Sequence, residues 1–118
     1  MSGTPPVSLG YPKAARLRLD RDFQPVRRAG RRILGTQASL RVLSTDRGHA
    51  RLGVATPRKY GGAVRRNRFR RLLREAFRGV AAELGSMDLL VEPRRDLREP
   101  TLGGLVADLR AAAGRRPS

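Results

Sequence analysis

The 118-residue sequence contains no cysteine and no tryptophan, and it has only three phenylalanines and two tyrosines. The absence of cysteine excludes disulfides, thiolate catalysis and cysteine-based zinc sites. No apolar run is longer than about three residues, which argues against a signal-peptide core and a transmembrane helix. We therefore expect a cytoplasmic protein whose stability comes from packing and from its partner.

Acidic residues are also scarce. Ten Asp and Glu stand against 26 Lys and Arg, which gives a formal net charge of +16. Such an excess opposes folding through self-repulsion unless a polyanion neutralises it, so a partner with many phosphates is expected. An anionic membrane is the alternative, but membrane-surface helices join basic charge to an apolar face rich in Trp or Phe, which this chain lacks. We expect a nucleic-acid partner and no membrane.

The sequence offers no convincing catalytic site of its own. Its one histidine, His49, lies in a predicted turn, and its acidic residues are scattered along the chain. A two-metal nuclease would need several carboxylates that converge on one point. We therefore predict no catalytic residue and no metal or cofactor bound by protein side chains.

The pattern of apolar and turn residues predicts one domain. Residues 1–15, rich in Pro, Gly and Ser, are expected to be a disordered leader, followed by a single domain at 16–113 and a basic tail at 114–118. A first short helix is predicted with Asp22 as its cap, Phe23 and Val26 inward, and Gly30 at its end. Strands are predicted at 32–34, 38–44, 50–56 and 87–92, a long helix at 62–84, and a last helix capped by Thr101. This order predicts an α+β fold in which the last two strands and the long helix form a crossover.

Alternation in the strand at 38–44 separates two faces. Ala38, Leu40 and Val42 fall on one face, and Ser39, Arg41 and Leu43 fall on the other. We expect one face to be core and the other to be accessible, with small or basic side chains.

The long helix is predicted to be two-faced. Its apolar stripe consists of Phe69, Leu72, Leu73, Ala76, Phe77, Val80 and Leu84, and its opposite side carries Asn67, Arg71, Arg74 and Arg78, with Arg70 close by. Arginines four residues apart, such as Arg66 and Arg70, repel one another in an isolated helix. This arrangement favours a bound polyanion over a merely solvated face.

Two features near the start of this helix leave alternatives open. Asn67 is either a cap or surface amide, or a functional group that contacts a base edge or ribose or holds Arg66 and Arg68 in position. The preceding turn, TPRKYGG at 56–62, could cradle a phosphate with its backbone N–H groups.

The class of nucleic-acid partner also stays open, because a general RNA-binding protein would share this charge. A DNA-binding protein would have to present the helix to the major groove rather than pack it lengthwise.

The stretch RKYGGAVRRNRFRRLLREAF, residues 58–77, resembles the signature of the bacterial ribonuclease P protein subunit. Similarity extends over about residues 16–112, from RLRLDRDFQPVRRAGRR through DLLVEPR to the last helix. The resemblance implies a two-layer α/β sandwich in the order α-β-β-β-α-β-α, similar to the second domain of a small-subunit ribosomal protein. It also implies a left-handed crossover around the long helix.

The resemblance further implies the accessory subunit of an endoribonuclease ribonucleoprotein. In that family the protein joins a catalytic RNA, and the complex hydrolyses precursor tRNA to free its mature 5′ end. The RNA subunit with bound Mg²⁺ supplies the chemistry, and the protein assists binding of the 5′ leader. No obligate protein partner is expected.

Site residues follow from the same resemblance. Contacts with the catalytic RNA are expected from Arg58, Lys59, Arg66, Asn67, Arg68, Arg70, Arg71 and Arg74. A leader-binding cleft is expected around Phe23, Arg27, Ala38 and Arg41, although Phe23 could instead be a core residue. The last three replace aromatic residues of many relatives, so leader binding is expected to depend more on charge and less on base stacking.

Overall fold

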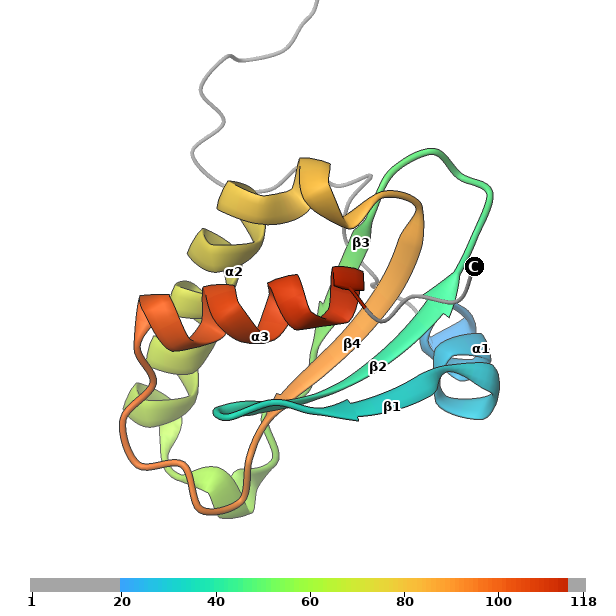
Figure 1. The fold of residues 1–118 in the computed structure, drawn as a ribbon. Coiled ribbons are helices and arrows are strands. Elements are labelled where there is room, and N and C mark those ends of the chain that lie inside the picture. Colours follow the sequence, from blue (N-terminus) through green and yellow to red (C-terminus); the bar gives the residue numbers. More distant parts are fainter. Residues whose placement is uncertain (1–19, 115–118) are drawn as a thin grey trace, which may run out of the picture.

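The computed structural model describes residues 20–114, which form a four-stranded sheet and three α-helices (Figure 1). The elements are α1 (Asp20–Ala29), β1 (Arg31–Leu34), β2 (Ala38–Ser44), β3 (Arg51–Val54), the 3₁₀ turn η2 (Arg58–Tyr60), α2 (Ala63–Leu84), β4 (Met87–Pro93) and α3 (Leu102–Gly114). The predicted α+β class and element order are confirmed. The predicted leader and nearly all of the predicted basic tail lie outside the described residues.

The strands lie in the order β1-β2-β4-β3, so the last strand of the chain is inserted between two earlier ones (Figure 1). β1 pairs with β2, and β2 with β4, in antiparallel fashion. β3 pairs with β4 in parallel, with Arg51 opposite Asp88. A parallel pair of neighbouring strands needs a crossover connection, and α2 supplies it, as predicted.

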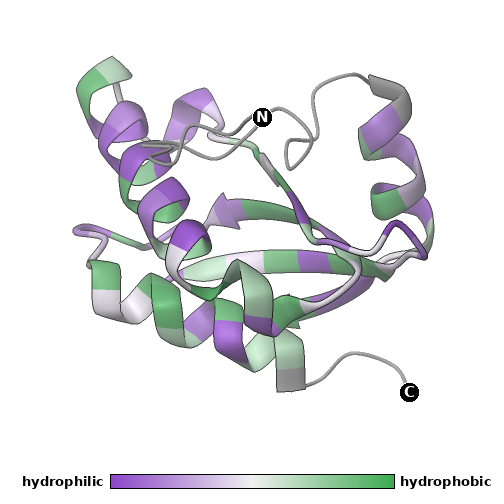
Figure 2. Cartoon of the chain, turned by 90° about the horizontal axis from the view of Figure 1, so that it is seen from above, coloured by the Kyte–Doolittle hydropathy of each residue, from purple (hydrophilic) through white to green (hydrophobic). Residues whose placement is uncertain are grey.

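The two faces of the sheet are covered unequally. On one face, apolar residues such as Leu40 and Leu89 form the main core with α2 and α3. On the other face, Val26 of α1 packs on Leu90 and forms a smaller cluster. Figure 2 shows α1 and α3 on opposite sides of the sheet. Among the described residues, no helix is long and apolar enough to cross a membrane.

The predicted role of Asp22 as a helix cap is wrong. α1 begins at Asp20, so Asp22 lies inside the helix, and Pro25 falls beyond the first turn. The Asp22 carboxylate instead faces Arg51, with 3.6 Å between Oδ1 and Nη1. The end of the helix is as predicted, because the Gly30 N–H donates to the Val26 carbonyl at 2.9 Å.

Arg51 ties α1 to the sheet. Its Nε and Nη2 donate to the two carboxylate oxygens of Asp88 at 2.9 and 2.7 Å, and the residue is only 9% exposed. The hydrogen bonds to Asp88 raise the pKa of the Arg51 guanidinium above its ordinary value, so this buried group stays charged. With Asp22 on the same guanidinium, three elements meet at one side chain.

The start of α3 is capped as predicted. The Gly104 N–H donates to Thr101 Oγ1 at 3.1 Å. Gln37 also forms two hydrogen bonds with Thr101, each at 2.9 Å: its Nε2 donates to the hydroxyl, and its Oε1 accepts from the Thr101 N–H. A Cβ at position 104 would lie 2.1 Å from Gln37 Nε2, so a larger residue there would push this amide away from Thr101.

A second buried carboxylate holds the β1–β2 connection against α3. Asp108 is 3% exposed and accepts hydrogen bonds from the backbone N–H groups of Thr36, Gln37 and Ala38 at 2.8, 2.8 and 3.0 Å. It also accepts one from the Thr36 hydroxyl at 3.1 Å. No local pattern in the sequence marks this residue as a buried acceptor.

Candidate nucleic-acid interface

The apolar side of α2 fixes the helix on the core. Six residues of the predicted stripe are buried: Phe69, Leu73, Ala76, Phe77, Val80 and Leu84. The seventh, Leu72, is partly exposed and packs against them. Because the stripe runs along the whole helix, its packing fixes the position of the opposite, basic side relative to the sheet. The predicted two-faced helix is confirmed.

The opposite side of α2 carries what we call the arginine row, which consists of Asn67, Arg70, Arg71 and Arg74. Arg71 and Arg74 are exposed, and neither has an ion pair with another described residue. Arg70 is half-buried, and its Nη1 donates to the Asn67 Oδ1 at 2.8 Å. Asn67 therefore positions Arg70, rather than Arg66 and Arg68.

The three residues of the Arg-Asn-Arg motif point in different directions, because successive residues of an α-helix are about 100° apart. Arg66 is half-buried, and its Nε is buried without a hydrogen-bond partner among the described residues. Arg68 lies on the other flank, with its Nη2 at 3.4 Å from Glu99 Oε1. Both groups of that pair are more than half exposed, so the pair contributes at most about 1 kcal/mol.

Arg58 and Lys59 lie in η2, directly before α2, and both are exposed. The third residue of this turn, Tyr60, is buried and meets Phe69 edge-on, with 5.9 Å between the ring centroids. The aromatic anchor holds the two cations beside the start of the helix.

Arg65 has a structural use that the sequence analysis missed. Its guanidinium lies over the Tyr60 ring, 4.5 Å from the centroid, and its Nη2 donates to the carbonyls of Leu97 and Arg98. A Cβ at Gly61 would lie 2.6 Å from Arg65 Cδ, so the glycine makes room for this side chain. The sequence carries one indication of this structural role: helical periodicity places Arg65 on the side of α2 away from the arginine row.

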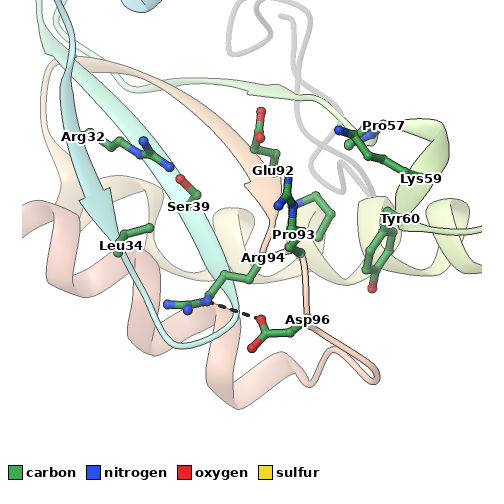
Figure 3. Close-up of a pocket in the computed structure, with 11 residues that line it drawn as sticks. Arg32, Leu34, Ser39, Pro57, Lys59, Tyr60, Glu92, Pro93, Arg94 and Asp96 are labelled. Carbon is green, nitrogen blue, oxygen red and sulfur yellow. Dashed lines mark ion pairs between the residues drawn. The ribbon is translucent and has the colours of Figure 1, made fainter.

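A groove of about 670 Å³ opens on the sheet face opposite α2 and α3 (Figure 3). It is lined by strand residues, by η2 and by the β4–α3 connection: Arg32, Leu34, Ser39, Pro57, Lys59, Tyr60, Glu92, Pro93, Arg94, Arg95 and Asp96. Four of these side chains are basic and two are acidic. One acid is neutralised locally, because Asp96 Oδ1 lies 3.6 Å from Arg94 Nε.

None of the four predicted cleft residues is among those that line the groove, but three of them lie on the same side of the sheet as the groove. Phe23 packs partly buried beside the Val26 cluster, and the Arg27 guanidinium lies 5.9 Å from the centre of its ring. Arg41 is half-buried on β2 and is directly opposite Arg32 on β1. Like charges at this spacing repel, so a bound anion would stabilise the pair.

The fourth predicted cleft residue, Ala38, is a wrong prediction. Its side chain is 1% exposed and belongs to the main core with Leu40 and Val42. The cause is the two-residue period of the strand, which turns Ala38 to the face opposite Arg41. Ala38 cannot line the groove.

No metal centre is evident in the described part of the chain. Among residues 20–114, no three His, Asp or Glu side chains gather in a way that could hold an ion. The potential ligands for a polyanion are instead guanidinium and ammonium groups on two surfaces, the arginine row and the groove.

Comparisons with known proteins agree on one family. A family model described as Ribonuclease P matches residues 11–116. A protein of Chlamydia muridarum is 39% identical over 102 residues, which cover 86% of this chain and 85% of that protein. A protein of Staphylococcus haemolyticus is 30% identical over 89 residues, covering 75% and 78%. Both are named ribonuclease P protein component.

Solved structures agree with this similarity. The ribonuclease P protein from Thermotoga maritima superposes with a TM-score of 0.75 at 28% identity, covering 87% of this chain and 98% of that one. The protein from Staphylococcus aureus gives a TM-score of 0.74 at 26% identity, covering 86% and 94%.

Proposed function

Because this chain belongs to the family of ribonuclease P protein components, we propose that its arginine row binds the catalytic RNA of that complex and that its groove binds the 5′ leader of precursor tRNA. Membership makes the chain a subunit of an endoribonuclease complex with an RNA partner. The observation that carries the proposal is the arginine row, in which exposed Arg71 and Arg74 stand on a helix anchored by six buried residues.

The arginine row suits a phosphate backbone. A guanidinium donates two parallel hydrogen bonds to one phosphate, and its planar fork loses less entropy on binding than a flexible ammonium does. Asn67 already orients Arg70, so part of that ordering is present before RNA arrives. Arg58, Lys59 and the half-buried Arg66 extend the same surface at the start of α2.

The groove suits a single strand. Its basic side chains can follow a phosphate backbone, and partly buried Phe23, which packs on the same face of the sheet against Val26 and Leu90, can stack on a base for about 1–3 kcal/mol. Tyr60 also lines the groove but is buried, so Phe23 is the one partly exposed aromatic on this face among the described residues, and we expect charge to contribute more than stacking. We place the hydrolysis of the leader on the RNA subunit and its bound Mg²⁺, with the protein as the accessory that holds RNA and substrate.

The test is reconstitution. The purified chain is added to bacterial ribonuclease P RNA and precursor tRNA at a Mg²⁺ concentration at which the RNA alone cleaves slowly. We expect faster release of the 5′ leader, because the bound protein lowers the metal requirement. Equal cleavage with and without the chain would contradict the proposal and would favour a general RNA-binding or DNA-binding role.

A second prediction concerns Arg41 on the groove face. In the assembled complex, Arg41→Ala should reduce the dependence of leader affinity on salt, because one phosphate contact is lost. The slope of log affinity against log salt should become shallower by about 0.7, the value for a single strand. This slope is measured by titrating the complex with precursor tRNA that carries either a long or a minimal leader.

The matched control for Arg41 is Arg110→Ala. Arg110 lies on α3, on the other side of the sheet, and pairs with Glu83 at 3.1 Å. This variant removes the same charge, so its slope should equal that of the wild type. If Arg41→Ala and Arg110→Ala have the same slope, Arg41 does not contact the leader.

A further inference from the structure

Glu92 is an acidic side chain at the centre of the basic groove. It lies on β4 and points into the groove, between Arg32 and Ser39 on one side and Pro57 and Lys59 on the other (Figure 3). Unlike the groove's second acid, it has no ion pair with any residue that the structure describes. A carboxylate in this position opposes phosphate binding, so a groove that bound only the backbone would do better without it.

The surroundings of Glu92 leave its carboxylate accessible. Ser39 is its neighbour on β2. On the other side lies Ala55, which continues β3 and whose N–H donates to the Val91 carbonyl at 2.9 Å. Because both flanking side chains are small, a flat ring can approach the carboxylate edge-on. The Ser39 hydroxyl also has no hydrogen-bond partner within the described residues.

A carboxylate offers acceptors only, so it selects among bases by their donors. Guanine presents two adjacent donors on its Watson–Crick edge, N1–H and N2–H, which match the two carboxylate oxygens. Adenine and cytosine each present one exocyclic amine, and the single N–H of uracil stands between two carbonyls that a carboxylate repels. In single-stranded RNA these edges are free to be read.

We propose that Glu92 makes the groove selective for guanine at one position of the single-stranded leader. The two Glu92 oxygens accept from guanine N1–H and N2–H, and the neighbouring Ser39 hydroxyl donates to O6. Arg32 and Arg95, which line the same groove, hold the flanking phosphates. This inference rests on the proposed function, because it takes leader RNA as the occupant of the groove.

The experiment uses the complex assembled from the full chain, ribonuclease P RNA and precursor tRNA. One leader position at a time carries G, A, C or U, and the dissociation constant of each substrate is measured. At one position we expect guanine to be favoured over uracil by about tenfold, the discrimination of one bidentate contact. RNA without the protein should lack this preference.

Glu92→Gln tests the hydrogen bonds. Glutamine keeps the shape but replaces one acceptor by a donor, so the preference for guanine should fall below about twofold while overall affinity is kept or increased. Circular dichroism checks that the fold is unchanged. A preference that persists in this variant, or a wild type that shows none at any position, overturns the inference.

Asp96→Asn is the matched control, because it removes the same charge from the same groove. It should strengthen binding of all four substrates alike and keep the preference for guanine. If it abolishes the preference as Glu92→Gln does, selectivity comes from groove charge and the inference is overturned. Faster cleavage on adding the chain, without base preference, overturns this inference alone, whereas no gain in cleavage overturns the proposed function as well.

Discussion

Replacing Arg71 and Arg74 together with alanine is expected to weaken binding of ribonuclease P RNA by about 10- to 100-fold at low salt. Each side chain is exposed and has no ion pair with a described residue, so each is available for a charge-assisted hydrogen bond to phosphate. Stability should change by no more than about 0.5 kcal/mol, because both residues lie on the surface of the helix. The fold and the RNA affinity are therefore separable at these two positions.

The measurement is a filter-binding titration repeated over a range of salt concentrations. Loss of two phosphate contacts should make the slope of log affinity against log salt shallower by about 1.4–1.8. Arg110→Ala is again the control, since its partner Glu83 lies on the flank of α2 away from the arginine row. Unchanged affinity and slope in the double variant would show that the arginine row does not bind the RNA.

Asp108→Ala is expected to lower the free energy of unfolding by about 3–5 kcal/mol, the summed cost of several unsatisfied donors and a large part of the total for a domain of this size. The substitution leaves three backbone N–H groups and the Thr36 hydroxyl without their acceptor. Ala38 is buried and Gln37 is half-buried beneath α3, so water can replace the carboxylate at the exposed Thr36 but not fully at the other two N–H groups.

Urea denaturation measures this loss as a shift of the midpoint at constant slope. Asp108→Asn should fall between wild type and alanine, because the amide keeps one acceptor oxygen. Asp96→Ala provides the control, since that side chain is 81% exposed and its removal should change stability by no more than about 0.5 kcal/mol. A loss below about 1 kcal/mol for Asp108→Ala would mean that the hydrogen bonds of the carboxylate contribute little.

In this chain, the sequence predicts well those elements that depend on residues close together in the sequence. The long helix was predicted to run from 62 to 84 and is observed as Ala63–Leu84, because its apolar residues recur at helical spacing and Gly85 ends it. Thr101 was predicted correctly as a cap from the helix that follows it. Alternation along β2 likewise separated its buried side chains from its accessible ones correctly, although it did not say which set faces the core.

What sequence did not predict depends on distant partners. Asp108 lies 70–72 residues from the groups that it binds, and no local pattern distinguishes it from a surface acid on α3. Asp22 resembles a cap because Asp favours that position, but it faces Arg51, which is far along the chain. Ala38 was assigned to the cleft by resemblance although alternation already placed it on the other face. In that conflict the strand geometry was right.

The position of β4 links folding to the completion of synthesis. β4 is made last among the strands, yet β2 and β3 both pair with it, and within the described residues β3 has no other strand partner. A chain growing on the ribosome therefore finishes the arginine-rich α2 before the sheet beneath that helix can close. Asp108, which holds the β1–β2 connection, arrives later still. Long-range pairing of this kind slows folding, so the nascent chain carries its full basic helix through an interval in which the apolar stripe is uncovered.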